Sequence, residues 1–423
     1  MIPVQTLREN PEKAIRRLAV KNFDASGLIP EILHQDDLRK STQFQLDEKL
    51  NESNRIAKEI GILFKEGKNA EASVLKEKTS LLKEESRLLE EKLQSLQLSL
   101  NDLLVKLPNL PDESVPSGKS ANDNIVILSE GSLPALEPGS VPHWELTTRY
   151  DLISFELGSK VTGAGFPFYK GKGAKLQRAL ISFFLDEAIA AGYTEFQPPL
   201  MVNEESAYAT GQLPDKEGQM YHVTADNLYL IPTAEVPVTN LYRNSNLRFS
   251  DLPVKLCAYS NCFRREAGSY GKDVRGLNRL HQFDKVEIVQ LAHPAVSFKV
   301  LEEMTGHVAG LLRKLELPFR MVKLCGGDMS FTSALTYDFE VYAAAQDKWL
   351  EVSSVSNFID FQANRMKLRF KDEDGKSRLL HTLNGSALAL PRIVAALLEN
   401  NQTASSINIP KALVPYTGFA RIE

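Results

Sequence analysis

The sequence predicts an α+β protein in which an N-terminal antiparallel coiled-coil hairpin precedes a part built from both strands and helices. Two observations predict the hairpin: leucines recur every seven residues between positions 75 and 103, and a polar break containing Gly67 interrupts the helical region at residues 66–69. A third observation predicts the second part. Alternating side chains, as in the run from Arg279 to Glu287, indicate antiparallel strands.

Length and composition bound the class of protein. The chain has 423 residues, of which 43% are hydrophobic and 25% are charged, so two or three globular domains are expected. The net charge of −4 gives no global electrostatic argument for a nucleic-acid partner, and any such binding requires local patches. The three cysteines form no CxxC pair, which favours free thiols over zinc or disulfides.

The N-terminus, MIPVQTLREN, lacks the basic and then apolar organisation of a secretory signal. The most apolar helix-like stretch, ALISFFLDEAIAAGY, is too short to span a bilayer and carries Asp186 and Glu187. We therefore expect a cytoplasmic protein that does not use a membrane.

The predicted hairpin follows a short helical lead-in over residues 1–36. Its second helix has heptad leucines, with Leu93, Leu100 and Leu107 joining later. Apolar or small residues mark the first helix in steps of four and three: Leu46, Leu50, Ser53, Ala57, Ile60 and Phe64. The break at Gly67 makes the two helices antiparallel, and each exceeds what a globular domain needs. From residues alone, such an arm is a dimerisation device or a probe for a partner. Ten Lys and Arg against eleven Asp and Glu over residues 41–92 favour a structural or protein-binding coiled coil over an RNA binder.

The stretch PNLPDESVPSGKSANDN has the composition of a linker. It includes Gly118-Lys119-Ser120, but Glu113 stands where a phosphate-binding P-loop needs its first glycine. We predict three regions: a helical domain with the arm at 1–107, a linker at 108–124 and a domain of strands and helices at 125–423. Within the last, apolar positions at helical spacing predict a helix over 174–191 that ends at Gly192, followed by a strand that ends at Pro198.

The stretch from Cys262 to Glu287 carries the clearest signal for chemistry. It reads as a strand, a Gly-rich loop and a second strand, and residues two apart on a strand share a face. Arg264 and Glu266 would then point together, as would Arg279, His281, Phe283, Lys285 and Glu287. A guanidinium, a carboxylate and an aromatic ring on one face suit a nucleotide's phosphate, exocyclic amine and base. The alternative is a hairpin with a charged outer face.

These residues resemble motif 2 of the class II aminoacyl-tRNA synthetases. The sequence FRREAGSYGKDVRGLNRLHQFDKVE is most similar to the seryl-tRNA synthetase family in its bacterial form. Other stretches match the same family in order. The helix and strand before Pro198 resemble motif 1, LIPTAEVPVTN resembles the loop that brackets the amino acid, LEVSSVSN resembles the E-[IV]-S-S strand, and HTLNGSALALPRIVAALLENNQ resembles motif 3. The chain departs from many members at four positions: Val355, Asn364, Ala387 and Pro391.

The resemblance implies a mixed, mostly antiparallel sheet flanked by helices. It also implies a serine–tRNA ligase that converts serine and ATP to seryl-adenylate and pyrophosphate, then transfers serine to the tRNA. Arg264 and Arg392 would be catalytic. The implied ATP-binding residues are Arg264, Arg265, Glu266, Arg275, Arg279, Phe283, Glu351, Val352, Ser353, Ser354 and Arg392. The implied serine-binding residues are Thr233, Ala234, Glu235, Arg264, Glu287, Asn384 and Ser386.

The cofactor implied by the resemblance is Mg²⁺ with ATP, held by Glu351 and Ser354, and no zinc is expected. The first implied partner is a serine tRNA, whose long variable arm would be bound by the coiled-coil arm of the protein. A selenocysteine tRNA is implied as a further substrate, and a second copy of the chain as the partner in a homodimer. Candidate phosphate contacts on the arm are Arg55, Lys58, Lys65, Lys68 and Lys76.

Two other functions remain open at this point. One is a ligase that loads an activated amino acid onto a carrier protein. The other is a coiled-coil scaffold with a decayed synthetase domain.

Overall fold

The computed structural model describes residues 1–215, 217–266 and 275–423, so most of the predicted Gly-rich loop, residues 267–274, lies outside the described residues. The chain forms two compact units. The arm unit comprises Ile2–Ala19 and Phe23–Pro108, and the catalytic unit comprises Met1, Val20–Asn22 and Asn109–Glu423.

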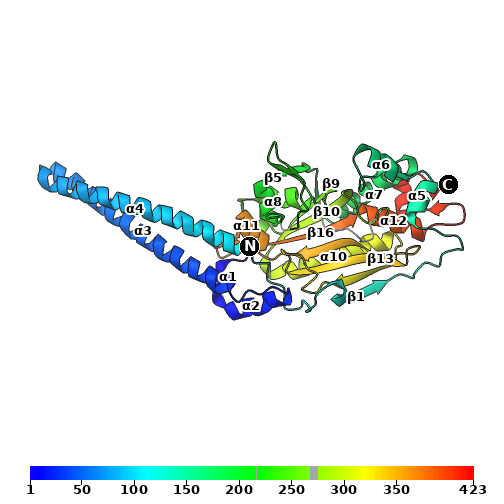
Figure 1. The fold of residues 1–423 in the computed structure, drawn as a ribbon, viewed down its shortest axis with the longest axis horizontal. Helices are drawn as coiled ribbons and strands as arrows, with labels where there is room; N and C mark the ends of the chain where they lie inside the picture. Colours follow the sequence, from blue (N-terminus) through cyan, green and yellow to red (C-terminus); the bar gives the residue numbers. More distant parts are fainter. Residues whose placement is uncertain (216, 267–274) are drawn as a thin grey trace. The chain divides into compact units, whose positions relative to one another are not determined.

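The arm unit is helical, with the two long helices α3 (Leu28–Lys65) and α4 (Asn69–Leu104) packed along each other (Figure 1). Gly67, with φ of 77°, lies in the turn between them, as predicted. With 38 residues, α3 is about 57 Å long. It begins earlier than expected, because residues 28–36 of the predicted lead-in already belong to it. Two short helices precede it: α1 (Val4–Glu9) and α2 (Pro11–Val20).

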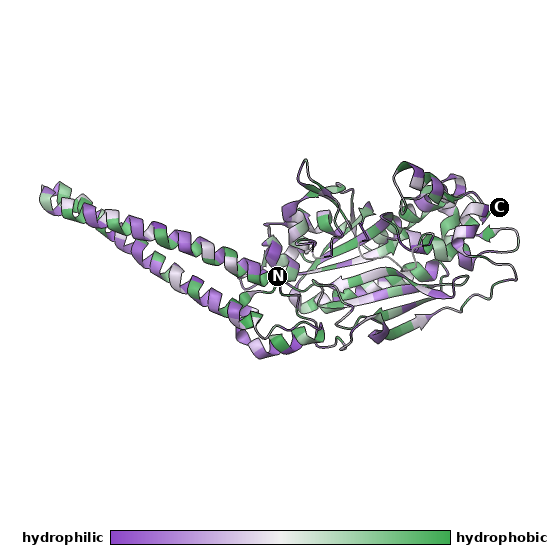
Figure 2. Cartoon of the chain, in the orientation of Figure 1, coloured by the Kyte–Doolittle hydropathy of each residue, from purple (hydrophilic) through white to green (hydrophobic). Residues whose placement is uncertain are grey.

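The contact line between the long helices follows the predicted leucines on α4 but only half of the predicted positions on α3: Leu46, Ser53 and Ile60 are buried or half-buried, whereas Leu50, Ala57 and Phe64 are exposed. Hydrophilic and hydrophobic residues alternate along both helices (Figure 2). Leu50 and Phe64, expected at the contact, are 40% and 44% exposed, while Ile56 is buried. Lys49 occupies the contact position instead of Leu50, half-buried, with its ammonium 2.7 Å from Glu85 on α4. The line therefore takes a step of three after Leu46, which a search for apolar side chains alone misses. The α4 residues on it were predicted correctly: Leu75, Leu82, Leu89, Leu96 and Leu103.

The catalytic unit is built on an eight-stranded sheet with the order β1-β11-β12-β13-β16-β10-β9-β4. All neighbouring pairs are antiparallel except β4 and β9, which confirms a mixed, mostly antiparallel sheet. Its strands are β1 (Ile125–Glu130), β4 (Thr194–Phe196), β9 (Val254–Phe263), β10 (Gln282–Ala292), β11 (Phe319–Lys323), β12 (Leu335–Ala343), β13 (Lys348–Asn357) and β16 (His381–Ala389).

Helices and short strands surround this sheet (Figure 1). The helices are α5 (His143–Arg149), α6 (Phe155–Val161), α7 (Gly171–Ala190), α8 (Glu204–Thr210), α9 (Glu235–Thr239), α10 (Ser297–Lys314), α11 (Phe361–Met366), α12 (Leu390–Asn400) and α13 (Val414–Thr417). The short strands are β2 (Ile153–Ser154), β3 (Phe168–Tyr169), β5 (Met201–Asn203), β6 (His222–Val223), β7 (Leu228–Leu230), β8 (Asn246–Arg248), β14 (Arg369–Lys371), β15 (Ser377–Leu379), β17 (Ile407–Asn408) and β18 (Arg421–Ile422).

The two faces of β10 separate packing from chemistry. Val286 and Ile288 belong to the main hydrophobic core, together with side chains of α7, α10 and α12. Phe283, Lys285 and Glu287 alternate with them and line a cavity on the other face. The predicted alternation is thus confirmed for these three residues, and β10 fixes their spacing.

The predicted hairpin exists, with Gln282 opposite Phe263 and Glu287 opposite Ala258. Both of its strands are shorter than expected at the end next to the loop. Arg264 and Glu266 follow the last residue of β9, and Arg279 and His281 precede the first residue of β10. Strand alternation therefore does not place these four side chains. His281 stacks on Phe166 instead, with ring centroids 5.5 Å apart.

From Asn109 onward, the stretch with linker composition belongs to the catalytic unit and is anchored in it by Asn109. This residue is buried, and its side-chain amide donates to the carbonyl oxygens of Thr332 and Phe358, both at 2.8 Å. In the part of the chain that the structure describes, no helix is long and apolar enough to cross a membrane.

Candidate active site

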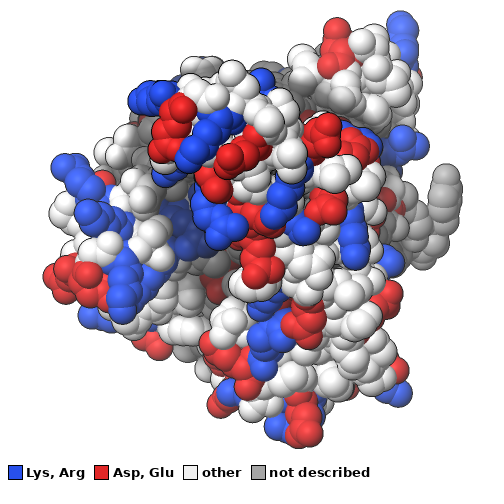
Figure 3. All heavy atoms as spheres, turned by 90° about the vertical axis from the view of Figure 1, so that its left-hand side faces the viewer, with Lys and Arg blue, Asp and Glu red and all other residues white. Residues whose placement is uncertain are grey.

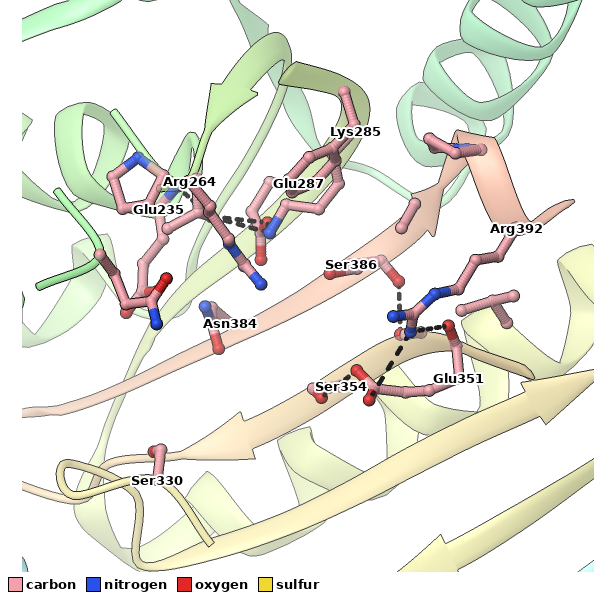
Figure 4. A pocket seen from close by; sticks show the side chains of 18 of the residues that line it. Glu235, Arg264, Lys285, Glu287, Ser330, Glu351, Ser354, Asn384, Ser386 and Arg392 are labelled. Atoms are coloured by element: carbon pink, nitrogen blue, oxygen red, sulfur yellow. Dashed lines mark hydrogen bonds and ion pairs between the residues drawn. The ribbon is translucent and has the colours of Figure 1, made fainter. Parts of the chain in front are cut away.

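A cavity of about 540 Å³ opens on the face of the sheet formed by β10, β16 and β13 (Figure 4). It brings together residues from four stretches that are far apart in sequence. The predicted site residues that line it are Thr233, Glu235, Arg264, Glu266, Arg279, Phe283, Glu287, Glu351, Val352, Ser353, Ser354, Asn384, Ser386 and Arg392.

Arg264 and Phe283 lie on the same side of the sheet. The guanidinium carbon of Arg264 is 5.2 Å from the centroid of the Phe283 ring, and both side chains line the cavity. The backbone of Arg264 is held on both sides: its N–H donates to the carbonyl of His281 at 2.9 Å, and its carbonyl lies 3.0 Å from Nδ1 of His281. A fixed cation next to an aromatic face is a suitable place for a phosphate and a base.

One end of the cavity is a buried polar cluster of Thr233, Lys285 and Glu287. Lys285 donates to Oγ1 of Thr233 at 2.8 Å and forms an ion pair with Glu287, and Thr233 donates to Glu287 at 2.9 Å. The second carboxylate oxygen of Glu287, Oε1, is buried and has no hydrogen-bond partner among the described residues. An oxygen of this kind inside a cavity is available to a cationic ligand.

Glu235 lies in the same part of the cavity, at the first residue of α9. Gln362 donates to its Oε1 at 2.7 Å, and Thr382 in turn donates to the Gln362 carbonyl oxygen at 2.7 Å. Burial, followed by the charge of Glu287, raises the pKa of Glu235 to about 7. Because the charge of Glu287 acts on Glu235, the two carboxylates suit a ligand that brings a positive charge.

The raised pKa of Glu235 predicts a pH-dependent stability. The unfolded carboxyl titrates near 4.5, so between that pH and about 7 the folded protein keeps a proton that the unfolded chain has lost. The contribution of the Glu235 carboxyl to the free energy of unfolding is fully present below pH 4.5 and is lost as the pH rises through 7. The loss is on the order of 3 kcal/mol.

Glu235→Gln should remove this contribution. We expect the difference in free energy of unfolding between the native chain and the variant to decline from pH 5 to pH 8, measured by urea unfolding at each pH. A difference that stays constant over this range would refute the raised pKa.

The opposite end of the cavity holds Arg392, Glu351 and Ser354. Arg392 lies in the first turn of α12, which starts at Leu390. Its NH1 donates to the Glu351 carbonyl at 2.7 Å and lies 3.8 Å from the Glu351 carboxylate. Ser354 donates to the same carboxylate at 3.5 Å. Figure 4 shows this group across the cavity from Arg264.

The donors at Glu351 and Ser354 fit Mg²⁺ only if a ligand completes the set. Among the described residues no group of three His, Cys, Asp or Glu side chains is placed to hold a metal ion. One carboxylate and one hydroxyl suit an ion that keeps waters and binds phosphate oxygens, as Mg²⁺ does. The three cysteines are buried and unpaired.

Several predicted site residues are placed differently from the resemblance. Arg265 and Ala234 do not line the cavity; the Arg265 guanidinium lies 5.9 Å from the Tyr221 ring. Arg275 lies outside it as well, with its guanidinium 4.6 Å from the Trp144 ring. Glu266 and Arg279 line the cavity but form an ion pair with each other. Their roles toward ATP stay predictions.

The cavity also contains residues that sequence reasoning did not assign to the site. Lys285 was placed on the correct strand face but received no role, although it is buried and forms an ion pair with Glu287. The others come from loops whose closeness no spacing rule predicts: Gln212, Glu217, Gln219, Asn278, Ser330 and Thr332.

The candidate tRNA contacts are on the arm unit, and all five are exposed. Lys68 pairs with Glu66 at 2.8 Å, and the Lys76 ammonium lies 4.7 Å from the Phe64 ring. Lys and Arg are interspersed with Asp and Glu on the face of the molecule drawn in Figure 3. Charge density alone therefore does not single out an RNA-binding patch on that face.

Comparisons with known proteins cover the whole chain. Residues 1–111 match the Seryl-tRNA synthetase N-terminal domain, and residues 221–401 match the tRNA synthetase class II core domain (G, H, P, S and T). A serine–tRNA ligase of Salinibacter ruber is 51% identical, covering 100% of this chain and 99% of the relative. One from Akkermansia muciniphila is 45% identical, covering 99% of this chain and 98% of the relative. The crystal structure of a seryl-tRNA synthetase from Pyrococcus horikoshii, complexed with ATP, has a TM-score of 0.91 at 34% identity and covers 100% of this chain and 99% of that one. The chain belongs to the seryl-tRNA synthetase family.

Proposed function

We propose that this chain ligates L-serine to its tRNA, with ATP converted to AMP and pyrophosphate. The observation that carries the proposal is the cavity itself. Arg264 and Phe283 stand beside the buried Thr233–Lys285–Glu287 cluster, with Arg392 and Glu351 across from them. A site for an anionic nucleotide thus adjoins a small, acidic site for an amino acid. Membership of the family, shown by relatives that align over nearly their full length, supports the same activity.

In the first step a carboxylate oxygen of serine attacks the α-phosphorus of ATP. A phosphorus–oxygen bond forms, the bond to pyrophosphate breaks, and seryl-adenylate results. The serine carboxylate is already ionised, so no general base is required, and the protein contributes positioning and charge neutralisation. Arg264 would neutralise the α-phosphate and the serine carboxylate, and Phe283 would stack on adenine.

The remaining nucleotide contacts would divide between the two ends of the site. Arg392, with Arg279 or Arg275, would hold the outer phosphates. Glu266 would accept from the adenine amine, which requires its ion pair with Arg279 to open or be shared. Glu351 and Ser354 would hold Mg²⁺, which supplies further neutralisation of the phosphates when bound.

Serine would bind through both of its polar ends. Oε1 of Glu287, which has no partner among the described residues, would accept from the serine ammonium. Glu235, Thr233, Asn384 and Ser386 would surround the rest of the amino acid. A site that pairs the hydroxyl rejects alanine well because its polar groups would otherwise stay unpaired, whereas threonine must be excluded by size.

In the second step a hydroxyl oxygen of the terminal adenosine of the tRNA attacks the carbonyl carbon of seryl-adenylate, and AMP leaves. The arm would bind the long variable arm of the tRNA. The selenocysteine tRNA as a further substrate, the homodimer and the cytoplasmic location follow from the family resemblance and stay predictions.

Pyrophosphate exchange with each of the twenty amino acids tests the proposal. We expect exchange with serine, with alanine lower by about 10⁴-fold. Charging of a serine tRNA then separates this enzyme from a ligase that loads a carrier protein. Exchange with a different amino acid, or with none, would overturn the proposal.

A further inference from the structure

Next to the cavity, the structure contains a buried pair that the mechanism above does not use. His143, the first residue of α5, and Glu399, near the end of α12, are both fully buried. Nδ1 of His143 lies 2.7 Å from Oε1 of Glu399, and the backbone N–H of His143 donates to the same oxygen at 2.9 Å. Burying two polar side chains without partners would be costly, so the packing of the core alone does not account for this pair.

The other ring nitrogen of His143 fixes the tautomer. Nε2 accepts from the backbone N–H of Leu277 at 2.9 Å. A backbone N–H can only donate, so Nε2 carries no proton, and the neutral ring donates from Nδ1 to Glu399. Gly276 allows this approach, because a Cβ there would lie 2.3 Å from Nε2 of His143.

A second chain of hydrogen bonds leads from Glu399 to Asn278, the residue that follows Leu277. Gln346 donates to Oε1 of Glu399 at 2.8 Å and accepts from the side-chain amide of Asn278 at 2.8 Å. The backbone N–H of Ala345 donates to Oε2 at 3.1 Å. One buried carboxylate is therefore connected to both Leu277 and Asn278, through two different side chains.

Leu277 and Asn278 line the cavity, and Asn278 contacts Arg392. Nε of Arg392 donates to the Asn278 carbonyl at 3.1 Å. Arg392 and Glu399 are seven residues apart on α12, so they lie on the same side of this helix. The helix thus holds the segment at two points: directly through Arg392, and through His143 and Gln346 from Glu399.

We propose that His143 and Glu399 are positioning residues that hold the segment of Leu277 and Asn278, and through it Arg392, in the geometry that binds the phosphates of ATP. The inference rests on the proposed function for the identity of the nucleotide. It predicts that damage to the pair weakens ATP binding and leaves serine binding unchanged, because the serine end of the cavity is formed by other residues.

Two substitutions of the same histidine separate its two hydrogen bonds. In His143→Gln, the side-chain carbonyl can take the place of Nε2 and accept from Leu277. In His143→Asn, the amide can take the place of Nδ1 and donate to Glu399, but the Leu277 N–H is left unpaired. We expect the dissociation constant for ATP, measured by calorimetry, to rise about tenfold in His143→Asn and less than about threefold in His143→Gln.

Further measurements separate positioning from general destabilisation. The KM for serine in pyrophosphate exchange should stay within about twofold in both variants, and His307→Asn on α10 serves as the control that loses a histidine elsewhere. Gln346→Met, which cuts the second chain of hydrogen bonds outside the cavity, should raise the dissociation constant for ATP about threefold even if a His143 variant fails to fold.

The proposal is overturned if both His143 variants bind ATP equally, or if ATP and serine constants change together with the melting temperature. ATP binding does not depend on which amino acid is activated. A native chain that binds ATP but shows no serine-dependent exchange would therefore contradict the proposed function and leave this test intact.

Discussion

Arg264→Ala is expected to lower the rate of serine-dependent ATP–pyrophosphate exchange by at least about 10³-fold. The Arg264 guanidinium lies 5.2 Å from the centroid of the Phe283 ring and lines the same cavity as the buried Lys285–Glu287 pair (Figure 4), where the α-phosphate and the serine carboxylate would meet. Both groups are negative, and their charge must be neutralised while the new bond forms. A fixed cation does this without reorganising at the moment of reaction, so its loss should reduce kcat more than it raises either KM.

Two further variants control this prediction. Arg264→Lys keeps the charge but loses the two-pronged geometry, and should fall between the native chain and Arg264→Ala. Arg248→Ala removes an exposed arginine that pairs locally, with Asp251 at 2.7 Å, and should leave exchange unchanged. Near-native exchange by Arg264→Ala would remove Arg264 from the proposed role.

Shortening the arm should abolish tRNA charging while adenylate formation continues. Removing residues 45–65 and 69–89 takes three heptads from each helix, about 31 Å, and keeps the turn with Gly67 and the phase of the apolar contact line. It also removes Arg55, Lys58, Lys65 and Lys76. We expect kcat/KM for charging to fall by at least about 10²-fold, because contacts to tRNA phosphates are lost, while pyrophosphate exchange stays within about twofold.

A full-length variant tests whether four of the candidate arm residues contact the tRNA as a group. Replacing Arg55, Lys58, Lys65 and Lys76 with glutamine keeps the length and removes four charges. If these residues contact phosphates, the salt dependence of charging should become less steep by a corresponding amount. Unchanged charging by the shortened chain would refute the assignment of the arm to tRNA binding.

The sequence predicted elements best where one period dominates. The heptad leucines of α4 and the alternation of Phe283, Lys285 and Glu287 on β10 were both predicted and observed. On α3 the same reasoning failed at Leu50, which is exposed, while the neighbouring Lys49 is half-buried and its ammonium reaches Glu85 on α4. A pattern of apolar letters does not include such amphipathic side chains.

The family motifs predicted some residues that line the cavity and others that do not. Arg264 and Arg392 were assigned from the family motifs and line the cavity. Arg265 and Arg275 were assigned in the same way, yet their guanidinium groups lie against Tyr221 and Trp144. Local geometry beyond the end of β9 decides where they point, and no periodicity determines it.

Contacts between distant segments were not predictable at all. His143 and Glu399 are 256 positions apart, and neither belongs to a motif that suggests a partner. Only the folded chain brings a histidine of α5 next to a glutamate of α12. The same holds for Gln362 and Thr382, which orient Glu235.

Strand β10 has one further consequence for how this enzyme can change. Phe283 and Glu287 are four residues apart on it, so the backbone sets about 13 Å between the part proposed to grip adenine and the part proposed to grip serine. The strand therefore fixes the distance between the two substrates. An insertion or deletion within β10 would shift both binding positions at once. A new amino-acid preference therefore has to arise by exchanging side chains on a strand of unchanged length.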